Sequence, residues 1–251
     1  MCYVSYSLGQ SRASVDGNYI SEIDPTDGSE IRYMTYYDRD FGGKITFFNI
    51  IKAEGETFWV NGCVLAGSPR WSWSDAATLF TAKITPSAVE LLNVYDTDNK
   101  INEFPSTNLV TKDDNLVMVT SKKHSVLARE FVTKVFRVRK IDLDLNDIWN
   151  KEIDLGVKDI IYTRSIDEGD NGDLIVSGTC IPLNQSKRTG FVVRLNSSGT
   201  VIESKIFNLG ANSYFVDLDY LSDGSYIFTG GINNFGKGKE FQDRFYLKTD
   251  S

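Results

Sequence analysis

Histidine and cysteine are scarce in this chain of 251 residues, which contains one histidine and three cysteines. Cys2, Cys63 and Cys180 form no CxxC pair, so their spacing indicates free structural thiols and excludes a disulfide framework. The single histidine, His124, stands without a G-x-S-x-G, P-loop or dinucleotide-binding motif elsewhere in the chain. The sequence therefore predicts no catalytic residue from a motif and no metal site.

Long apolar runs and basic clusters are also missing. No stretch approaches the ~20 apolar residues that cross a bilayer, and the N-terminal MCYVSYSLGQ lacks the features of a signal peptide. A net charge of −7 without any cluster of Lys and Arg argues against a nucleic-acid partner. The hydrophobic content of 41% is sufficient for a globular core.

A short motif recurs along the chain: a turn, then an apolar run that ends in a small or hydroxyl residue. The copies are FWVNG (Phe58 to Gly62), VMVTS (Val117 to Ser121), LIVSG (Leu174 to Gly178) and YIFTG (Tyr226 to Gly230). Strand-turn-strand segments lie between them, which gives four strands in each repeat of roughly 50 to 60 residues, the pattern of a β-propeller blade. We expect an all-β fold, a β-propeller of about five four-stranded blades with incomplete terminal blades. A β-sandwich or barrel is the alternative fold.

The repeats predict a single domain over residues 1–251. Its units span approximately residues 1–43, 44–98, 99–156, 157–210 and 211–251. Because the first and last units have room for only three strands each, the chain is expected either to close as a five-bladed ring or to form a segment of a longer array. The unpaired strand edges of incomplete blades would favour self-association.

Two segments carry a resemblance to a known group of proteins. GDLIVSGT followed by GFVVRLNSSGTVIESKIF, and SDGSYIFTGG followed by DRFYLKTDS, resemble the repeats of bacterial, often Bacteroidetes-type, surface and secreted β-propellers. The resemblance covers about Asp159 to Ser251. It implies an extracytoplasmic or cell-surface location and a role in binding or display, and it brings no catalytic signature.

The longest predicted loops emerge on one face of such a propeller, where function is usually found. The candidate ligand-binding residues in these loops are Arg70, Trp71, Trp73, Tyr37, Asp38, Asp40 and Asp96. In an extended loop Trp71 and Trp73 point to the same side, where their rings would stack on a sugar or a peptide. Packing of both rings against the neighbouring blades is the alternative.

Three functions are compatible with these features. The first expectation is a non-catalytic binding or display module for a carbohydrate or protein ligand, and therefore not an enzyme. The second is a glycoside hydrolase or lyase that uses loop carboxylates near the central channel, which requires two carboxyl groups about 5 to 10 Å apart. The third is a set of spacer blades from a larger surface protein. No cofactor is expected, with calcium at DTDNKINE or at DEGDNGD as the alternative.

Overall fold

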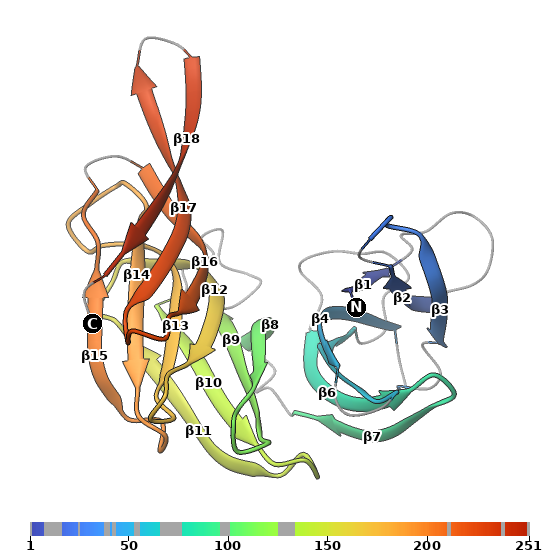
Figure 1. Ribbon diagram of the computed structural model, residues 1–251. Helices are drawn as coiled ribbons and strands as arrows, with labels where there is room; N and C mark the ends of the chain where they lie inside the picture. The colour runs from blue at the N-terminus through green and yellow to red at the C-terminus, as the bar shows by residue number, and fades with distance from the viewer. Residues whose placement is uncertain are drawn as a thin grey trace. The chain divides into compact units, whose positions relative to one another are not determined.

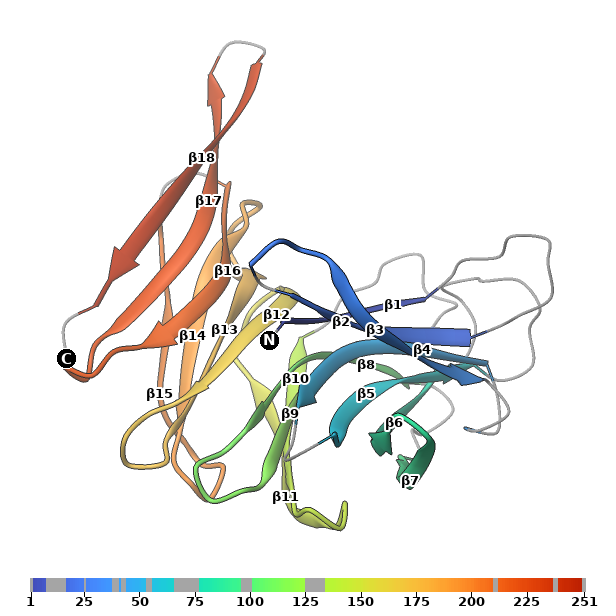
Figure 2. The same cartoon turned by 45° about the vertical axis from the view of Figure 1, so that its right-hand side comes forward.

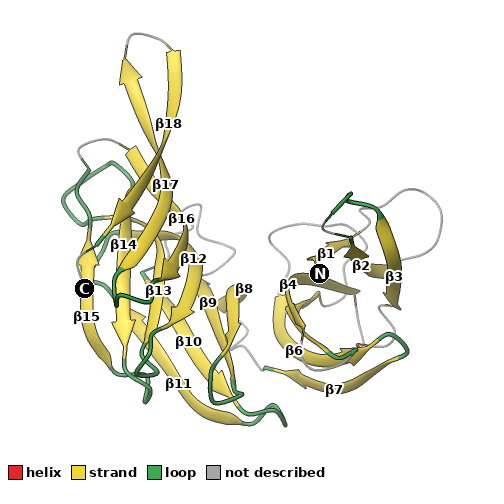
Figure 3. Ribbon diagram, viewed as in Figure 1, coloured by secondary structure: helices red, strands yellow, loops and turns green. Residues whose placement is uncertain are grey.

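The computed structural model describes residues 2–7, 17–24, 26–37, 41, 44–52, 56–65, 77–95, 101–124, 134–209, 212–236 and 239–249. These residues form strands and turns without any α-helix (Figure 3), so the expected all-β class is confirmed. Within the same ranges no helix has the length and apolar character needed to cross a membrane.

The strands assemble into five sheets, and hydrogen-bonded neighbours in each sheet are consecutive in sequence. The first sheet contains β1 (Cys2–Ser7), β2 (Gly17–Ile23) and β3 (Glu30–Tyr37). The second contains β4 (Lys44–Lys52), β5 (Phe58–Leu65), β6 (Ala77–Thr85) and β7 (Ala88–Val94). The third contains β8 (Ile101–Val110), β9 (Leu116–His124), β10 (Val135–Ile141) and β11 (Asp147–Asp154). The fourth contains β12 (Asp159–Glu168), β13 (Leu174–Ile181), β14 (Thr189–Leu195) and β15 (Val201–Ile206), and the fifth contains β16 (Asn212–Tyr220), β17 (Tyr226–Gly236) and β18 (Lys239–Lys248).

The chain divides into two compact units (Figure 1). Unit 1 comprises Met1–Pro105 with His124–Arg129, and unit 2 comprises Ser106–Lys123 with Glu130–Ser251. The core of unit 1 joins the first and second sheets, where Met34 and Tyr36 pack with Phe58. The Tyr36 hydroxyl also donates a hydrogen bond to the main-chain oxygen of Thr85, at 2.8 Å.

Unit 2 contains a core on each face of its fourth sheet. Between the third and fourth sheets the ring centroids of Phe136 and Phe191 are 5.8 Å apart. Between the fourth and fifth, the ring of Phe207, which follows β15, has its centroid 5.1 Å from that of Phe215 on β16. Every residue of β13 except its last is buried. This burial on both faces explains the uninterrupted apolar run of the motif.

The turns that precede the motif share one geometry in unit 2. The main-chain N–H of the first turn residue donates to the oxygen of the fifth, in the pairs Thr111–Asn115, Gly169–Asp173 and Leu221–Ser225. The fourth residue of each turn has a positive φ, at Asp114, Gly172 and Gly224. When the sheets are aligned on these turns, Thr120 of the third sheet corresponds to Gly178 of the fourth. The sequence had aligned Ser121 with Gly178, so the expected register of VMVTS was wrong by one residue.

The glycines that end the motif allow two strands to approach closely. A Cβ on Gly178 would lie 2.2 Å from the main-chain oxygen of Tyr162, and one on Gly230 would lie 2.2 Å from that of Tyr214. Both glycines face a β-bulge in the first strand of their sheet. In the first strand of a sheet, we call the residue at which pairing resumes directly after this bulge the post-bulge residue.

Candidate functional site

The ligand-binding residues predicted from the sequence fall almost entirely outside the described residues. These are Arg70, Trp71, Trp73, Asp38, Asp40 and Asp96. The seventh, Tyr37, is the last residue of β3 and is 38% exposed. The structure therefore leaves this set as a prediction.

A carboxylate occupies the post-bulge position of the fifth sheet. The post-bulge residues of the second, fourth and fifth sheets are Asn49, Ser165 and Asp217, all polar, and only Asp217 is ionisable. Ser165 Oγ donates to Asp217 Oδ1 at 2.7 Å, and the Leu218 N–H donates to the same oxygen at 3.0 Å. Asp217 is exposed, and no described residue donates a hydrogen bond to its Oδ2. One carboxylate oxygen is thus held in place while the other is free for a ligand.

Hydroxyl groups extend this polar region along the first strands of unit 2. Ser106 on β8 and Thr163 on β12 share a hydrogen bond between their hydroxyls, and Ser121 Oγ lies 3.3 Å from the same Thr163 oxygen. Ser106 Oγ also donates to the main-chain oxygen of Val119 at 3.0 Å. Polar side chains therefore connect β8 to β12, just as Ser165 connects β12 to β16.

A second carboxylate lies close to Asp217. Asp219 is exposed and follows two residues later on β16, so both side chains leave the same face about 7 Å apart along the strand. Asp167 of β12 differs, because its Oδ1 accepts the Glu168 N–H at 2.8 Å and its Oδ2 accepts the Tyr220 N–H at 2.6 Å. Asp167 therefore fixes the main chain, whereas Asp217 and Asp219 are available for chemistry.

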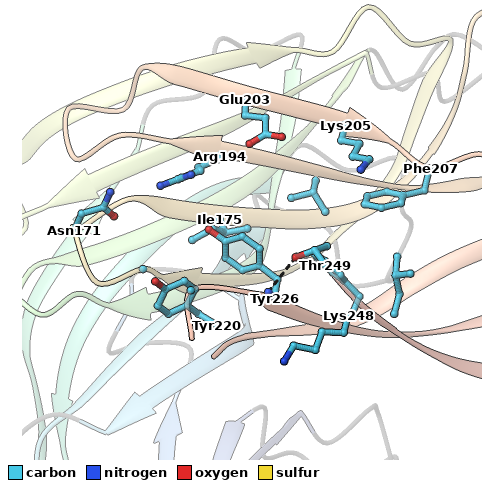
Figure 4. Close-up of a pocket in the computed structure, with 15 residues that line it drawn as sticks. Asn171, Ile175, Arg194, Glu203, Lys205, Phe207, Tyr220, Tyr226, Lys248 and Thr249 are labelled. Carbon is cyan, nitrogen blue, oxygen red and sulfur yellow. Dashed lines mark hydrogen bonds between the residues drawn. The ribbon is translucent and has the colours of Figure 1, made fainter. Parts of the chain in front are cut away.

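A groove of about 660 Å³ lies between the fourth and fifth sheets (Figure 4). Its charged lining residues are Arg194, Glu203, Lys205 and Lys248, and its aromatic ones are Phe207, Tyr220, Tyr226 and Phe228. Burial raises the pKa of Tyr226 above its ordinary value, although the positive charge of Arg194 acts in the opposite direction. The phenol is therefore neutral at physiological pH.

The acidic segment DEGDNGD beside this groove forms the hairpin between β12 and β13. Asp173 Oδ2 accepts hydrogen bonds from Arg194 Nε at 2.8 Å and from Asn171 Nδ2 at 2.9 Å. Asp170 pairs with Lys112 at 3.1 Å. Protein donors thus engage these carboxylates, and in the described part of the chain no group of three or more His, Cys, Asp or Glu side chains is arranged to hold a metal ion.

Comparisons with known proteins found similarity only among solved structures. No protein-family model matches the chain, and no curated protein matches it. A protein of unknown function from Bacteroides caccae has a TM-score of 0.52 at 11% identity, covering 92% of this chain and 71% of its own. This likeness concerns the fold.

Two further similar structures are enzymes. An endo-arabinase from Bacteroides thetaiotaomicron has a TM-score of 0.47 at 11% identity, with 99% of this chain and 89% of its own covered. An alpha-L-arabinanase from Cellvibrio cellulosa has a TM-score of 0.40 at 14% identity, with 98% and 90% covered. With enzymes among the neighbours, the expectation of a non-catalytic binding or display module is corrected, and so is the expectation that the chain is not an enzyme.

Proposed function

We propose that the chain is a carbohydrate-active enzyme, a glycoside hydrolase or a lyase, built as a five-bladed β-propeller. In this proposal each sheet is one blade and residues 1–251 form a single domain. The succession of five sheets supports the architecture, as do the similar turns of the third, fourth and fifth sheets. An extracytoplasmic location is part of the proposal and is supported by the resemblance of the repeats alone.

The observation that carries the catalytic proposal is the carboxylate of Asp217. The corresponding positions of the second and fourth sheets hold the neutral residues Asn49 and Ser165, so the bulge itself requires no charge. With Oδ1 fixed by two hydrogen bonds, Oδ2 is oriented to accept a proton or to attack a sugar carbon. Asp219 would supply the second carboxyl group, at a separation within the about 5 to 10 Å used by glycoside hydrolases.

Substitution of the two aspartates tests this assignment. The purified chain is incubated with a panel of polysaccharides that includes arabinan, and both new reducing ends and the ultraviolet absorbance of unsaturated products are measured. We expect turnover of at least one polysaccharide, and a fall in kcat of about 100-fold or more in Asp217→Asn and in Asp219→Asn. Asp144→Asn is the matched control, because it makes the same change on an exposed hairpin of unit 2.

Two results would contradict the proposal. One is the absence of turnover on every polysaccharide by a chain whose circular dichroism shows intact β-structure. The other is full activity in Asp217→Asn.

The loop residues predicted from the sequence remain a proposal for glycan contact. Trp71 and Trp73 would stack on sugar rings, with Arg70, Tyr37, Asp38, Asp40 and Asp96 as polar contacts. Replacing Trp71 and Trp73 together by alanine is expected to raise KM by about tenfold, because each aromatic contact contributes about 0.5–1.5 kcal/mol. The kcat should be nearly unchanged, because stacking away from the reacting bond stabilises the bound substrate and the transition state equally. An unchanged KM would remove these residues from the site.

A further inference from the structure

The outer edge of β18 is the open edge of the fifth sheet. In the second, third and fourth sheets a fourth strand (β7, β11 or β15) pairs with the third strand. No described strand pairs with the corresponding edge of β18, and the long hairpin of β17 and β18 projects from unit 2 (Figures 1 and 2). On this strand Tyr246 is 77% exposed. The main-chain groups along the edge are therefore available for a further strand.

The groove lies directly beside this edge and has an apolar floor. Val192 and Phe207 contribute to it from the fourth sheet, and Phe228 and Leu247 contribute from the fifth. All six residues of β15 are exposed. Glu203 and Lys205 of this strand line the groove.

The corresponding place between the third and fourth sheets is filled by protein. There Trp149 of β11 donates its indole N–H to the main-chain oxygen of Ser197, at 3.0 Å. A Cβ on Gly199 would lie 2.9 Å from the same indole ring. Both contacts come from the hairpin that connects β14 to β15, the fourth strand of its sheet. The groove thus occupies the position of a fourth strand and its hairpin in the fifth sheet.

The charged residues on the third and fourth strands of the other sheets indicate which partner strand would fit beside β18. In the other sheets a basic residue on the third strand meets an acidic residue on the fourth. The instances are Lys83 with Glu90 at 3.5 Å, Arg137 with Glu152 at 3.6 Å, and Arg194, which pairs in register with Glu203. Lys248 occupies the position in the fifth sheet that Arg194 occupies in the fourth. Lys248 pairs with Ile227 and Arg194 pairs with Ile175, and each isoleucine is the second residue of its motif. Lys248 already pairs with Asp223 at 2.7 Å, as Arg194 pairs with Asp173 at 2.6 Å, so the acid of a fourth strand would be a second partner at this position. Arg244 is a second exposed cation on β18, and no described residue forms an ion pair with it.

We infer that the edge of β18 and the adjoining groove bind an extended segment of a partner polypeptide as a fourth β-strand. Main-chain hydrogen bonds to β18 would provide affinity. Alternate apolar side chains would enter the groove, and an acidic residue would lie opposite Lys248. The partner strand therefore has alternating apolar and polar residues with an acid among the polar ones. This binding site is separate from Asp217 and does not depend on the proposed catalysis.

A peptide with the sequence of residues 200–208, TVIESKIFN, is a suitable probe because it contains the fourth strand of the neighbouring sheet. Labelled with a fluorophore and titrated with the intact chain, it is expected to show saturable binding by anisotropy. Amide hydrogen exchange along β18 should slow in the complex. A scrambled peptide of the same composition should not bind. A peptide carrying Ile206→Asp should bind at least tenfold more weakly, because Ile206 pairs with Phe191, and the counterpart of Phe191 on β18 is the apolar Phe245.

A charge exchange tests the register without altering the core. Lys248→Glu also loses the exposed ion pair with Asp223, and it is expected to weaken binding of the unaltered peptide by about fivefold, as for an exposed ion pair. A peptide with Glu203→Lys should prefer the Lys248→Glu chain over the wild type. Lys158→Glu is the matched control, since it makes the same change at an exposed residue away from β18.

The inference is overturned if the peptide binds no better than its scrambled version, or if exchange along β18 does not change. A chain that dimerises through β18 and excludes the peptide would also overturn it, and would assign the edge to self-pairing.

Discussion

Replacing Gly178 by alanine tests how closely β12 and β13 pack. The added Cβ would lie 2.2 Å from the main-chain oxygen of Tyr162 and 2.7 Å from the ring of Phe191. A main-chain carbonyl in a paired strand cannot rotate away as a flexible side chain does, so the two strands must separate. Overpacking of a core typically costs 1–3 kcal/mol, and we expect a loss of about 3 kcal/mol in the free energy of unfolding of unit 2.

The two buried cysteines provide the assay. Cys180 lies on β13 and Cys63 on β5 of unit 1, and burial raises the pKa of each thiol to about 12. An alkylating reagent therefore reaches either thiol only when its unit opens. A loss of about 3 kcal/mol corresponds to about 150-fold more of the open form. Mass spectrometry should show Cys180 alkylated faster by this factor in Gly178→Ala, with Cys63 unchanged.

Gly169→Ala is the matched control in the same sheet. Its added Cβ would meet the nearest atoms at 3.5 to 3.8 Å, an ordinary contact distance, so the rate at Cys180 should change by less than about threefold. Equal rates at Cys180 in Gly178→Ala and in the wild type would refute the reasoning, and so would equal acceleration by both substitutions.

Two further predictions concern acid stability and turn crowding. Burial acts to raise the pKa of Asp113, but hydrogen bonds from Lys140 and from its own hairpin outweigh it and hold the pKa at about 2. Because this pKa is below that of an aspartate in the unfolded chain, the ionised carboxylate stabilises the fold at neutral pH, and this stabilisation is lost as the pH falls from about 4 to about 2. The urea midpoint of Asp113→Asn should therefore decline less over that interval than the midpoint of the wild type. Gly199→Ala should lower the stability of unit 2 by about 2–3 kcal/mol, because φ is +78° and the new Cβ would lie 2.9 Å from Trp149. Gly28→Ala, where φ is +75° and no atom lies within 4 Å of the new Cβ, should lower the stability of unit 1 by only about 1–2 kcal/mol. Similar losses for the two variants in urea unfolding would argue against crowding of residue 199 by Trp149.

The sequence was informative about strands and turns because their signals are local. Gly172 and Gly224 mark turns that need a positive φ, and apolar runs follow them directly. The register of β9 was misjudged because Leu116 to Val119 are all apolar and Thr120 stands in place of the motif glycine. An apolar run of this kind fits two registers equally well, and only the turn hydrogen bond from Thr111 to Asn115 distinguishes them.

The candidate catalytic residues were not recognised from the sequence. Asp217 and Asp219 alternate with apolar residues in FVDLDYL, which is typical of any strand with one solvated face. What distinguishes Asp217 is the bulge before it and the hydroxyl of Ser165 beside it. Both depend on how strands pair and how sheets pack, so neither follows from local sequence. A useful signal was nevertheless present in Gly230, since a glycine within an apolar strand indicates a close approach by its neighbour.

The pairing of strands only with their neighbours in sequence has a consequence for folding. Each sheet forms from strands that are consecutive in sequence, so its contacts are local and need little of the rest of the chain. We expect the sheets to form one after another as the polypeptide leaves the ribosome. Successive sheets also resemble one another, so a strand from one sheet can pair in the place of its counterpart in the next. Exchange of equivalent strands between neighbouring sheets, or between two nascent chains, is therefore the characteristic misfolding route of this architecture.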